Sequence, residues 1–333
     1  MPTGPKPRAD RLLNAGSPPT EANKISVAIP LLNEEDVVVE LLERTRKVLD
    51  GLPGGPHEIV FVDDGSTDDT LARLTAAAES DPRIVVVSLS RNFGHQAALT
   101  AALEYVTGDA VVVMDGDLQD TPETIPRFLD ELRRGSEVVY AVRTDRKESW
   151  PMRFGYAAFY RLIASLAEVP LPVGAGDFGI MSRRVVDLLR QAPEQHRYLR
   201  GLRSWVGFRQ IGIPVERAAR QAGRPKYDFV KLLRLASDGI VSFTTWPLRI
   251  ATLIGSITLI GSLVCTVYVL IASLTRGELP RGVAVLVIVM VFLAGVQLLC
   301  LGIMGEYISR IYTEAKRRPP YVVDRVIRHS SNR

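Results

Sequence analysis

Short apolar runs and longer amphipathic segments alternate through the first third of the chain. Four runs rich in β-branched residues predict buried strands at Ser26–Leu31, Glu58–Val62, Ile84–Leu89 and Ala110–Met114. Segments with helical spacing lie between them, at Glu34–Leu49, Thr67–Ser80 and His95–Tyr105. Because the strands are apolar throughout and alternate with helices, the pattern predicts an α/β fold with a mostly parallel sheet covered on both faces.

Two much longer apolar runs lie near the C-terminus. Ile250–Leu274 and Val283–Met304 contain no charged residue, and a helix of either length would cross the roughly 30 Å hydrocarbon core of a bilayer. Only Thr275–Gly282 separates them, so they predict a transmembrane hairpin with both ends on one side. Basic flanking residues place that side in the cytoplasm. The alternative, a pair of buried core helices, fits these lengths poorly.

Polar clusters directly follow the four predicted strands. They are Asn33-Glu34, Asp63-Asp64-Gly65-Ser66, Arg91-Asn92 and Asp115-Gly116-Asp117. Ligands of parallel sheets bind beyond the carboxyl ends of the strands. The Asp63 cluster can equally be a turn and a helix N-cap. Asp115 and Asp117, however, would repel each other without a cation between them. Carboxylate ligands select Mg²⁺ or Mn²⁺, and substrate phosphates usually complete the coordination of such an ion. We therefore expect a diphosphate substrate.

Composition narrows the class further. The chain has 333 residues, of which 47% are hydrophobic, and a net charge of +4, which is too small to indicate a nucleic-acid partner. Two cysteines exclude a disulfide framework, and four scattered histidines disfavour a zinc cluster. Residues 1–24 lack the apolar run of a signal peptide and are expected to form a disordered tail. Two segments, Trp150–Leu166 and Tyr227–Phe243, mix aromatic and basic residues like helices in a lipid headgroup layer, although the first could equally face a core.

Six motifs, taken in order, resemble family 2 glycosyltransferases with a GT-A fold. Within that family the chain is similar to polyisoprenyl-phosphate glycosyltransferases, such as bacterial undecaprenyl-phosphate glucosyltransferases and dolichol-phosphate mannose synthase. The motifs are Ile29–Asp36, Val62–Thr70, Ser90–Leu99, Met114–Glu123, Gly176–Arg183 and Leu199–Phe208. The resemblance implies a Rossmann-like GT-A catalytic domain at 25–226, an interfacial helix at 227–246, two transmembrane helices within 247–306 and a cytoplasmic tail at 307–333.

The resemblance also assigns roles to single residues. Asp115 and Asp117 match the metal-binding pair, with Asp117 as the direct ligand of Mg²⁺ or Mn²⁺. Asp177 matches an acidic residue that faces the donor sugar, either orienting it or acting as a base. The residues implied near the donor nucleotide are Pro30, Asn33, Glu34, Asp64, Asn92 and Gln119. Those implied for the acceptor phosphate are Arg143, Arg153, Arg217, Arg220 and Lys226, and Arg220 is also the expected catalytic arginine.

The reaction implied is transfer of glucose from UDP-glucose to undecaprenyl monophosphate, with inversion, at the cytoplasmic face of a bacterial plasma membrane. A phosphate acceptor is already anionic and needs little help from a base. The resemblance further implies a homotetramer and a flippase-like partner. Departures at Gly179–Ser182 and Pro225 put the acceptor contacts and the sugar in doubt.

Two alternatives remain at this stage. One is a glycosyltransferase with a hydroxyl acceptor, including the polysaccharide synthases. Those synthases carry a Gln-x-x-Arg-Trp signature, whereas the nearest string here, Arg200–Trp205, lacks the glutamine spacing. The other is a catalytically silent membrane scaffold, which the intact Asp115 and Asp117 pair disfavours.

Overall fold

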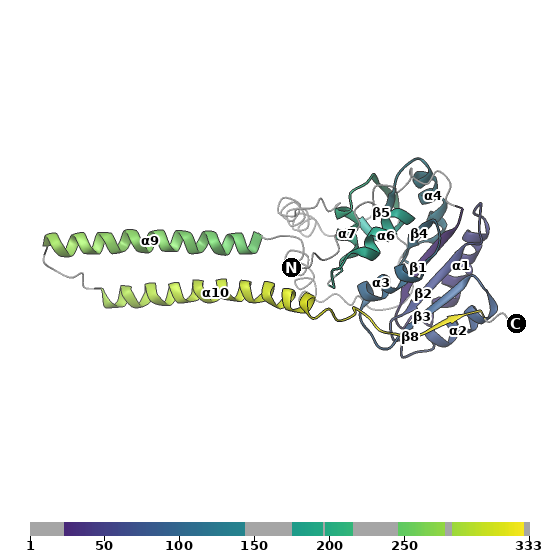
Figure 1. Cartoon of the computed structure of the whole chain (residues 1–333), viewed down its shortest axis with the longest axis horizontal. Helices are drawn as coiled ribbons and strands as arrows, with labels where there is room; N and C mark the ends of the chain where they lie inside the picture. The colour runs from purple at the N-terminus through teal and green to yellow at the C-terminus, as the bar shows by residue number, and fades with distance from the viewer. Residues whose placement is uncertain (1–22, 144–174, 196, 216–245, 277–281, 330–333) are drawn as a thin grey trace, which may run out of the picture. The chain divides into compact units, whose positions relative to one another are not determined.

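The computed structural model describes residues 23–143, 175–195, 197–215, 246–276 and 282–329 (Figure 1). These residues form two units, one built on a sheet and the other on two long helices. Each unit is described separately below.

The sheet unit has eight strands in the order β7-β5-β6-β4-β1-β2-β3-β8. The predicted strands form its centre, as β1 (Ile25–Leu31), β2 (Glu58–Asp63), β3 (Ile84–Leu89) and β4 (Ala110–Val113), and all pair in parallel. The remaining strands are β5 (Val138–Arg143), β6 (Ala175–Ser182), β7 (Gln210–Val215) and β8 (Val323–Arg328). Because β6 and β8 are antiparallel to their neighbours and β5 and β7 are parallel, the sheet is mostly parallel, which confirms the predicted α/β class.

Helices cover both faces of this sheet. One face packs against α1 (Val38–Asp50), α2 (Thr70–Ser80) and α4 (Ile125–Arg133), the last preceded by the short helix η2 (Pro122–Thr124). The other packs against α3 (His95–Tyr105), α6 (Arg183–Gln191) and α7 (Leu199–Trp205). Successive strand side chains alternate between the two cores, so that Phe61 joins the first and Val62 the second, and both are fully buried. Two buried faces explain why the strands are apolar throughout.

The chain after α10 ends in a strand that the predicted tail at 307–333 did not include. Figure 1 shows β8 beside β3, at the edge of the sheet. Ile327 is opposite Val86 in the register, and the Ser90 amide donates to the Val322 carbonyl at 2.9 Å. β8 therefore covers an edge of β3 that would otherwise expose unpaired backbone groups.

The second unit contains α9 (Trp246–Arg276) and α10 (Val283–Ala315), which lie side by side (Figure 1). Cys300 Sγ of α10 is 3.7 Å from the Ala251 carbonyl oxygen of α9. Many described apolar side chains of both helices are exposed, among them Ile257 at 62% and Leu298 at 69%. Such surfaces are typical of contact with lipid or protein. Among the described residues, one helical segment, Phe292–Ala315, is long and apolar enough to cross a membrane.

Candidate active site

The carboxyl ends of β2 and β4 and the start of β6 bring three carboxylates to one edge of the sheet. Asp64 and Asp115 come two residues after Val62 and Val113, which belong to the core under α3. Side chains two apart on a strand share a face, so both aspartates point to the α3 side. Val113 is opposite Gly179 in the antiparallel β4–β6 pair. Asp115 follows the end of β4 by two residues and Asp177 precedes Gly179 by two residues on β6, so both lie at this edge of the sheet.

Gly116 is the residue that lets the Asp115 and Asp117 loop close onto the end of β1. A Cβ at this position would lie 2.1 Å from Leu31 Cδ2. The loop is also held from within, because the Gln119 amide donates to Asp117 Oδ1 at 3.1 Å. Asp115 and Asp117 are both half-buried. Only glycine fits between them, so the Asp-Gly-Asp spacing has a steric cause as well as a chemical one.

His95 lies at this edge too, although the sequence analysis assigned it no role. It is the first residue of α3, and its Nε2 atom is 3.6 Å from Asp115 Oδ1, an atom buried from solvent. The imidazole also acts on two other carboxylates, since it is among the groups that favour the ionised forms of Asp64 and Asp177. The sequence feature that could have indicated a role for His95 is its position, because it lies in the motif after the third predicted strand and at the start of a predicted helix.

The loops after β1 and β2 are tied together by side-chain contacts. Asn33 adopts a left-handed conformation with φ of 54°, and its Oδ1 accepts from the Thr67 amide at 2.8 Å. The Glu34 amide donates to Thr70 Oγ1 at 2.9 Å. These contacts explain why α1 begins at Val38 and α2 at Thr70, later than predicted: the intervening residues form the linked loops. Pro30 is buried at the end of β1.

Asp64 organises the loop that precedes α3. Its side chain is only 2% exposed, and its two oxygens accept from the amides of Phe93 at 2.7 Å and Gly94 at 2.9 Å. Burial raises the pKa of Asp64 above its ordinary value, and the two amides offset part of that rise. Asn92, on the same loop, is exposed. Asp64 thus holds the loop that carries Asn92 and leads into His95.

Asp177 is paired with a residue that the sequence analysis did not place in the site. Arg200 of α7 contacts it through two parallel bonds, Nε to Oδ1 at 3.2 Å and Nη2 to Oδ2 at 3.0 Å. Burial opposes ionisation of Asp177, but the charge and hydrogen bonds of Arg200, together with the nearby His95 and Arg203, outweigh it and hold the pKa of Asp177 below its ordinary value. A carboxylate with a lowered pKa and a fixed guanidinium partner is a weak base.

The structure therefore brings the predicted donor and metal residues to one edge of the sheet but does not place the predicted acceptor residues. Arg143 ends β5, and its side chain is not described. Arg153, Arg217, Arg220 and Lys226 lie outside the described residues, as does most of the predicted helix at 227–246.

The donor set at Asp115 and Asp117 fits a divalent ion that is held partly by substrate. Carboxylate oxygens are the ligands that Mg²⁺ and Mn²⁺ prefer. Within the described ranges, no group of three or more histidine, cysteine or acidic side chains could hold an ion. A pair of carboxylates is what a protein is expected to supply when phosphate oxygens of the substrate provide the remaining ligands of the ion.

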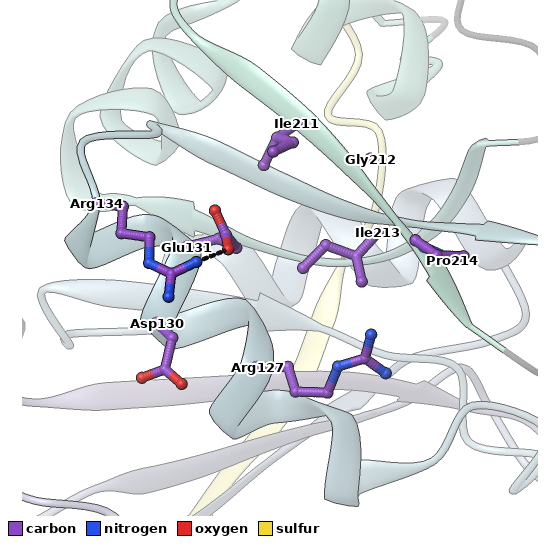
Figure 2. Close-up of a pocket in the computed structure, with 8 residues that line it drawn as sticks. All are labelled: Arg127, Asp130, Glu131, Arg134, Ile211, Gly212, Ile213 and Pro214. Carbon is purple, nitrogen blue, oxygen red and sulfur yellow. Dashed lines mark hydrogen bonds and ion pairs between the residues drawn. The ribbon is translucent and has the colours of Figure 1, made fainter.

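A separate hollow lies on the opposite face of the sheet, between α4 and β7 (Figure 2). Arg134 and Glu131 form an ion pair on its wall. It contains none of the predicted site residues, and its strand residue Ile213 belongs to the core on the α1 and α4 side. Since the carboxylates project from the other face, the hollow is not the site of their chemistry.

An α/β sheet with paired carboxylates beyond its strand ends defines a class of proteins that bind ligands at that edge. The chain matches the model of glycosyl transferase family 2 over residues 26–189. It is 41% identical to an uncharacterized glycosyltransferase of Synechocystis sp., covering 90% of this chain and 94% of the relative. It is also 39% identical to the bactoprenol glucosyl transferase of Shigella phage SfV, covering 90% of this chain and 98% of the relative.

Among solved structures, the chain is similar to the mannosyltransferase PcManGT from Pyrobaculum calidifontis, solved in complex with GDP-Man and Mn²⁺. The TM-score is 0.46 at 22% identity, covering 73% of this chain and 66% of that one. The assignment of the family rests on the sequence relatives and not on this partial superposition. The chain belongs to glycosyl transferase family 2, and it is a glycosyltransferase.

Proposed function

We propose that this enzyme transfers glucose from UDP-glucose to a polyisoprenyl monophosphate, undecaprenyl phosphate, at the cytoplasmic face of a bacterial plasma membrane. The observation that carries the proposal is the cluster of Asp115, Asp117 and Asp177 at the carboxyl edge of a family 2 fold. Relatives of 38–39% identity are named as bactoprenol glucosyl transferases, and bactoprenol is a polyisoprenyl lipid.

The donor half of the proposed reaction uses the edge formed by β1, β2 and β4. Asp115 and Asp117 would hold Mg²⁺ or Mn²⁺, and that ion would offset the charge of the departing nucleoside diphosphate. Asn33, Glu34 and Asp64 lie in or next to the linked loops where the nucleotide would bind. The remaining residues proposed for the donor are Pro30, Asn92 and Gln119.

The acceptor half needs a nucleophile but little base. A phosphate oxygen of the lipid forms the new bond to the anomeric carbon while the bond from that carbon to the diphosphate breaks, which inverts the configuration. The nucleophile carries its charge beforehand, so no proton has to be removed. The pairing of Asp177 with Arg200 supports this view, because a hydroxyl acceptor would require a base and Asp177 is poorly suited to that role. Arg143, Arg153, Arg217, Arg220 and Lys226 remain the proposed acceptor-phosphate residues.

We place both long helices in the membrane, as a hairpin of about 250–274 and 283–304. Exposed apolar side chains on α9 and α10 support this topology. The catalytic domain predicted at 25–226, together with the strand β8 that completes its sheet, would lie in the cytoplasm. The homotetramer and the flippase-like partner that carries the product outward are proposed from the family resemblance.

The test uses the purified full-length protein with Mg²⁺ or Mn²⁺, labelled UDP-glucose and undecaprenyl phosphate. The expected product is an acid-labile, lipid-linked sugar that disappears when the metal is chelated. The proposal is overturned if no labelled lipid forms with UDP-glucose, UDP-galactose, UDP-N-acetylhexosamine or GDP-mannose. Transfer to a lipid alcohol instead of a lipid phosphate would favour the hydroxyl-acceptor alternative.

A further inference from the structure

Arg200 is held in a single orientation at the edge of the site. Two of its nitrogens are bonded to the two oxygens of Asp177, which is the fork geometry in which arginine binds planar anions. The side chain of Arg200 keeps 27% of its surface exposed, whereas that of Asp177 keeps 14%. The carboxylate therefore fixes the guanidinium while part of the Arg200 side chain remains in contact with solvent.

A second arginine, which is buried, lies close to this pair. Arg203 is 4% exposed, its Nη2 is 3.4 Å from the Gly176 carbonyl oxygen, and its guanidinium lies over the Tyr140 ring at 4.8 Å. Within the described residues, its Nε has no hydrogen-bond acceptor, and no carboxylate lies within ion-pair distance of it. Burial lowers the pKa of Arg203 to about 10, so it is still charged at neutral pH. Arg203 therefore adds a second positive charge close to Asp177.

The position of the cluster connects it to the proposed metal site. Asp115 and Asp177 lie at the same end of the β4–β6 pair, and the ion proposed at Asp115 would offset the charge of Asp115. The helix that carries Arg200 is also tied to the start of α3, because the Leu199 amide donates to Gln96 Oε1 at 3.0 Å. Arg200 is therefore positioned by the same elements that position Asp115 and His95.

We propose that Arg200 is a phosphate-binding residue of the active site and that Asp177 is the positioning residue that orients it. A buried, charged Arg203 beside a fixed and partly exposed Arg200 side chain favours an anion. The inference rests on the proposed function, since the phosphate is supplied either by the diphosphate of the donor or by the head of the lipid acceptor. Asp177 then acts through Arg200 and does not remove a proton.

The chain contains a matched control for Arg200. Arg83 contacts Asp81 in the same fork, through Nε at 3.1 Å and Nη2 at 3.0 Å, with side-chain exposures of 32% and 12%. It precedes β3 and so lies at the amino edge of the sheet, away from the carboxylates of the site. Arg83 also pairs with Asp50, so Arg83→Ala removes the same kind of fork and a second ion pair without touching the site.

The experiment compares wild type, Arg200→Ala, Arg200→Lys, Asp177→Asn and Arg83→Ala as full-length proteins in nanodiscs. Three quantities are measured: the Kd of UDP with Mn²⁺ by calorimetry, the KM for undecaprenyl phosphate at saturating donor, and the thermal midpoint. Loss of the charged contact to phosphate is expected to weaken binding about 10- to 100-fold in Arg200→Ala, and Arg200→Lys, which keeps the charge but not the fork, should weaken it by a smaller factor. Asp177→Asn should weaken the same binding step by a smaller factor. Arg83→Ala should change neither the Kd of UDP nor the KM for undecaprenyl phosphate.

The two sources of phosphate give different results. If Arg200 binds the donor diphosphate, the Kd of UDP rises while that of uridine does not. If it binds the acceptor, the KM for undecaprenyl phosphate rises and the Kd of UDP is unchanged. Values of Kd and KM for Arg200→Ala that match those of Arg83→Ala overturn the inference. A fall in kcat for Asp177→Asn, with unchanged binding and loss of the acid limb of the pH profile, would make Asp177 a base and overturn its positioning role.

Two further measurements keep the outcome decisive. Arg200→Ala could lower the thermal midpoint because Asp177 is left unpaired. In that case the Arg200→Lys variant and the Asp177→Asn/Arg200→Gln double variant decide whether Arg200 binds phosphate. If the wild type binds UDP but makes no lipid-linked sugar, the proposed function fails, and the Kd of UDP alone decides whether Arg200 binds phosphate. If the wild type binds no UDP, both proposals are overturned.

Discussion

Each end of strand β2 carries a buried carboxylate, and the two carboxylates have very different hydrogen-bond partners. At the amino end, Glu58 is 7% exposed and accepts from Lys24 Nζ at 2.9 Å, Ser26 Oγ at 2.6 Å and Thr107 Oγ1 at 2.8 Å. Burial opposes its ionisation, but these partners outweigh burial and lower the pKa of Glu58. At the carboxyl end, the hydrogen-bond partners of Asp64 among the described residues are two backbone amides, and burial raises its pKa.

The difference separates a structural polar network from a functional one. The partners of Glu58 satisfy its charge within the protein, so this end of the sheet has no need of a ligand. At the other end, Asp64, Asp115 and Asp117 gather at one edge of the sheet, and the His95 imidazole lies 3.6 Å from Asp115. Such a concentration of one sign of charge is stabilised when a cation or a polar ligand binds. Four predictions sharpen this comparison.

The largest effect is expected for Asp117→Ala, which removes a proposed metal ligand from the carboxyl edge. Turnover should fall roughly 1000-fold, because the charge of the leaving group would no longer be offset. The thermal midpoint should stay near that of wild type, since Asp117 is only half-buried. The control is Asp130→Ala, an exposed aspartate of α4 on the other face. A turnover close to that of the control would refute the metal assignment.

The opposite behaviour is expected at the amino end of β2. Glu58→Gln should lower the free energy of unfolding by about 3 kcal/mol, because one partner of a buried charged network is removed. Activity per folded molecule should be unchanged. Glu79→Gln, at an exposed position of α2, is the matched control. Thermal unfolding followed by intrinsic fluorescence measures the stability, and a loss equal to that of the control would contradict the assignment.

Gly116→Ala should affect both stability and activity. The added Cβ would meet Leu31 Cδ2, and relief of that overlap is expected to cost about 2 kcal/mol. The same displacement would separate Asp115 from Asp117 and reduce turnover. Gly51→Ala is the control, because a Cβ there would meet its nearest atom at 3.5 Å, an ordinary contact. If Gly116→Ala loses no more stability and turnover than Gly51→Ala, the close approach of Gly116 to β1 is not needed for either property.

The smallest effect is in the pH dependence of stability. A lowered pKa means that Glu58 contributes stability above its ordinary value of 4.5, and this contribution is lost as the pH falls through its folded pKa. Asp64 has a raised pKa, so its contribution is present below 3.8 and is lost as the pH rises through its folded pKa. Between pH 5 and 3, Glu58→Gln should therefore lose less stability than wild type, and Asp64→Asn should lose more. The same sign of change in both variants would contradict the comparison.

The sequence predicts the centre of the fold well because burial on both faces makes each central strand an uninterrupted apolar run. Strand β3 and helix α3 have the predicted bounds, Ile84–Leu89 and His95–Tyr105. The start of α1 was predicted four residues early, at Glu34 instead of Val38, because residues that could continue a helix are held in a loop by contacts with a distant loop. The strand β8 was missed because it pairs with β3, which lies far away in the sequence.

The same distinction applies to the site. Residue order alone indicated that polar clusters follow the strands and that Asp115 and Asp117 form a pair, since parallel strands place their carboxyl ends at a common edge. Only the tertiary structure decided that His95 meets Asp115 and that Arg200 fixes Asp177. Those partners lie about twenty residues away along the chain, and whether they meet depends on the order of β4 and β6 in the sheet and on how α3 and α7 pack. The local sequence pattern determines the helices and strands and the sheet edge at which the polar clusters lie. Strand order and helix packing determine which charged side chains face each other at that edge.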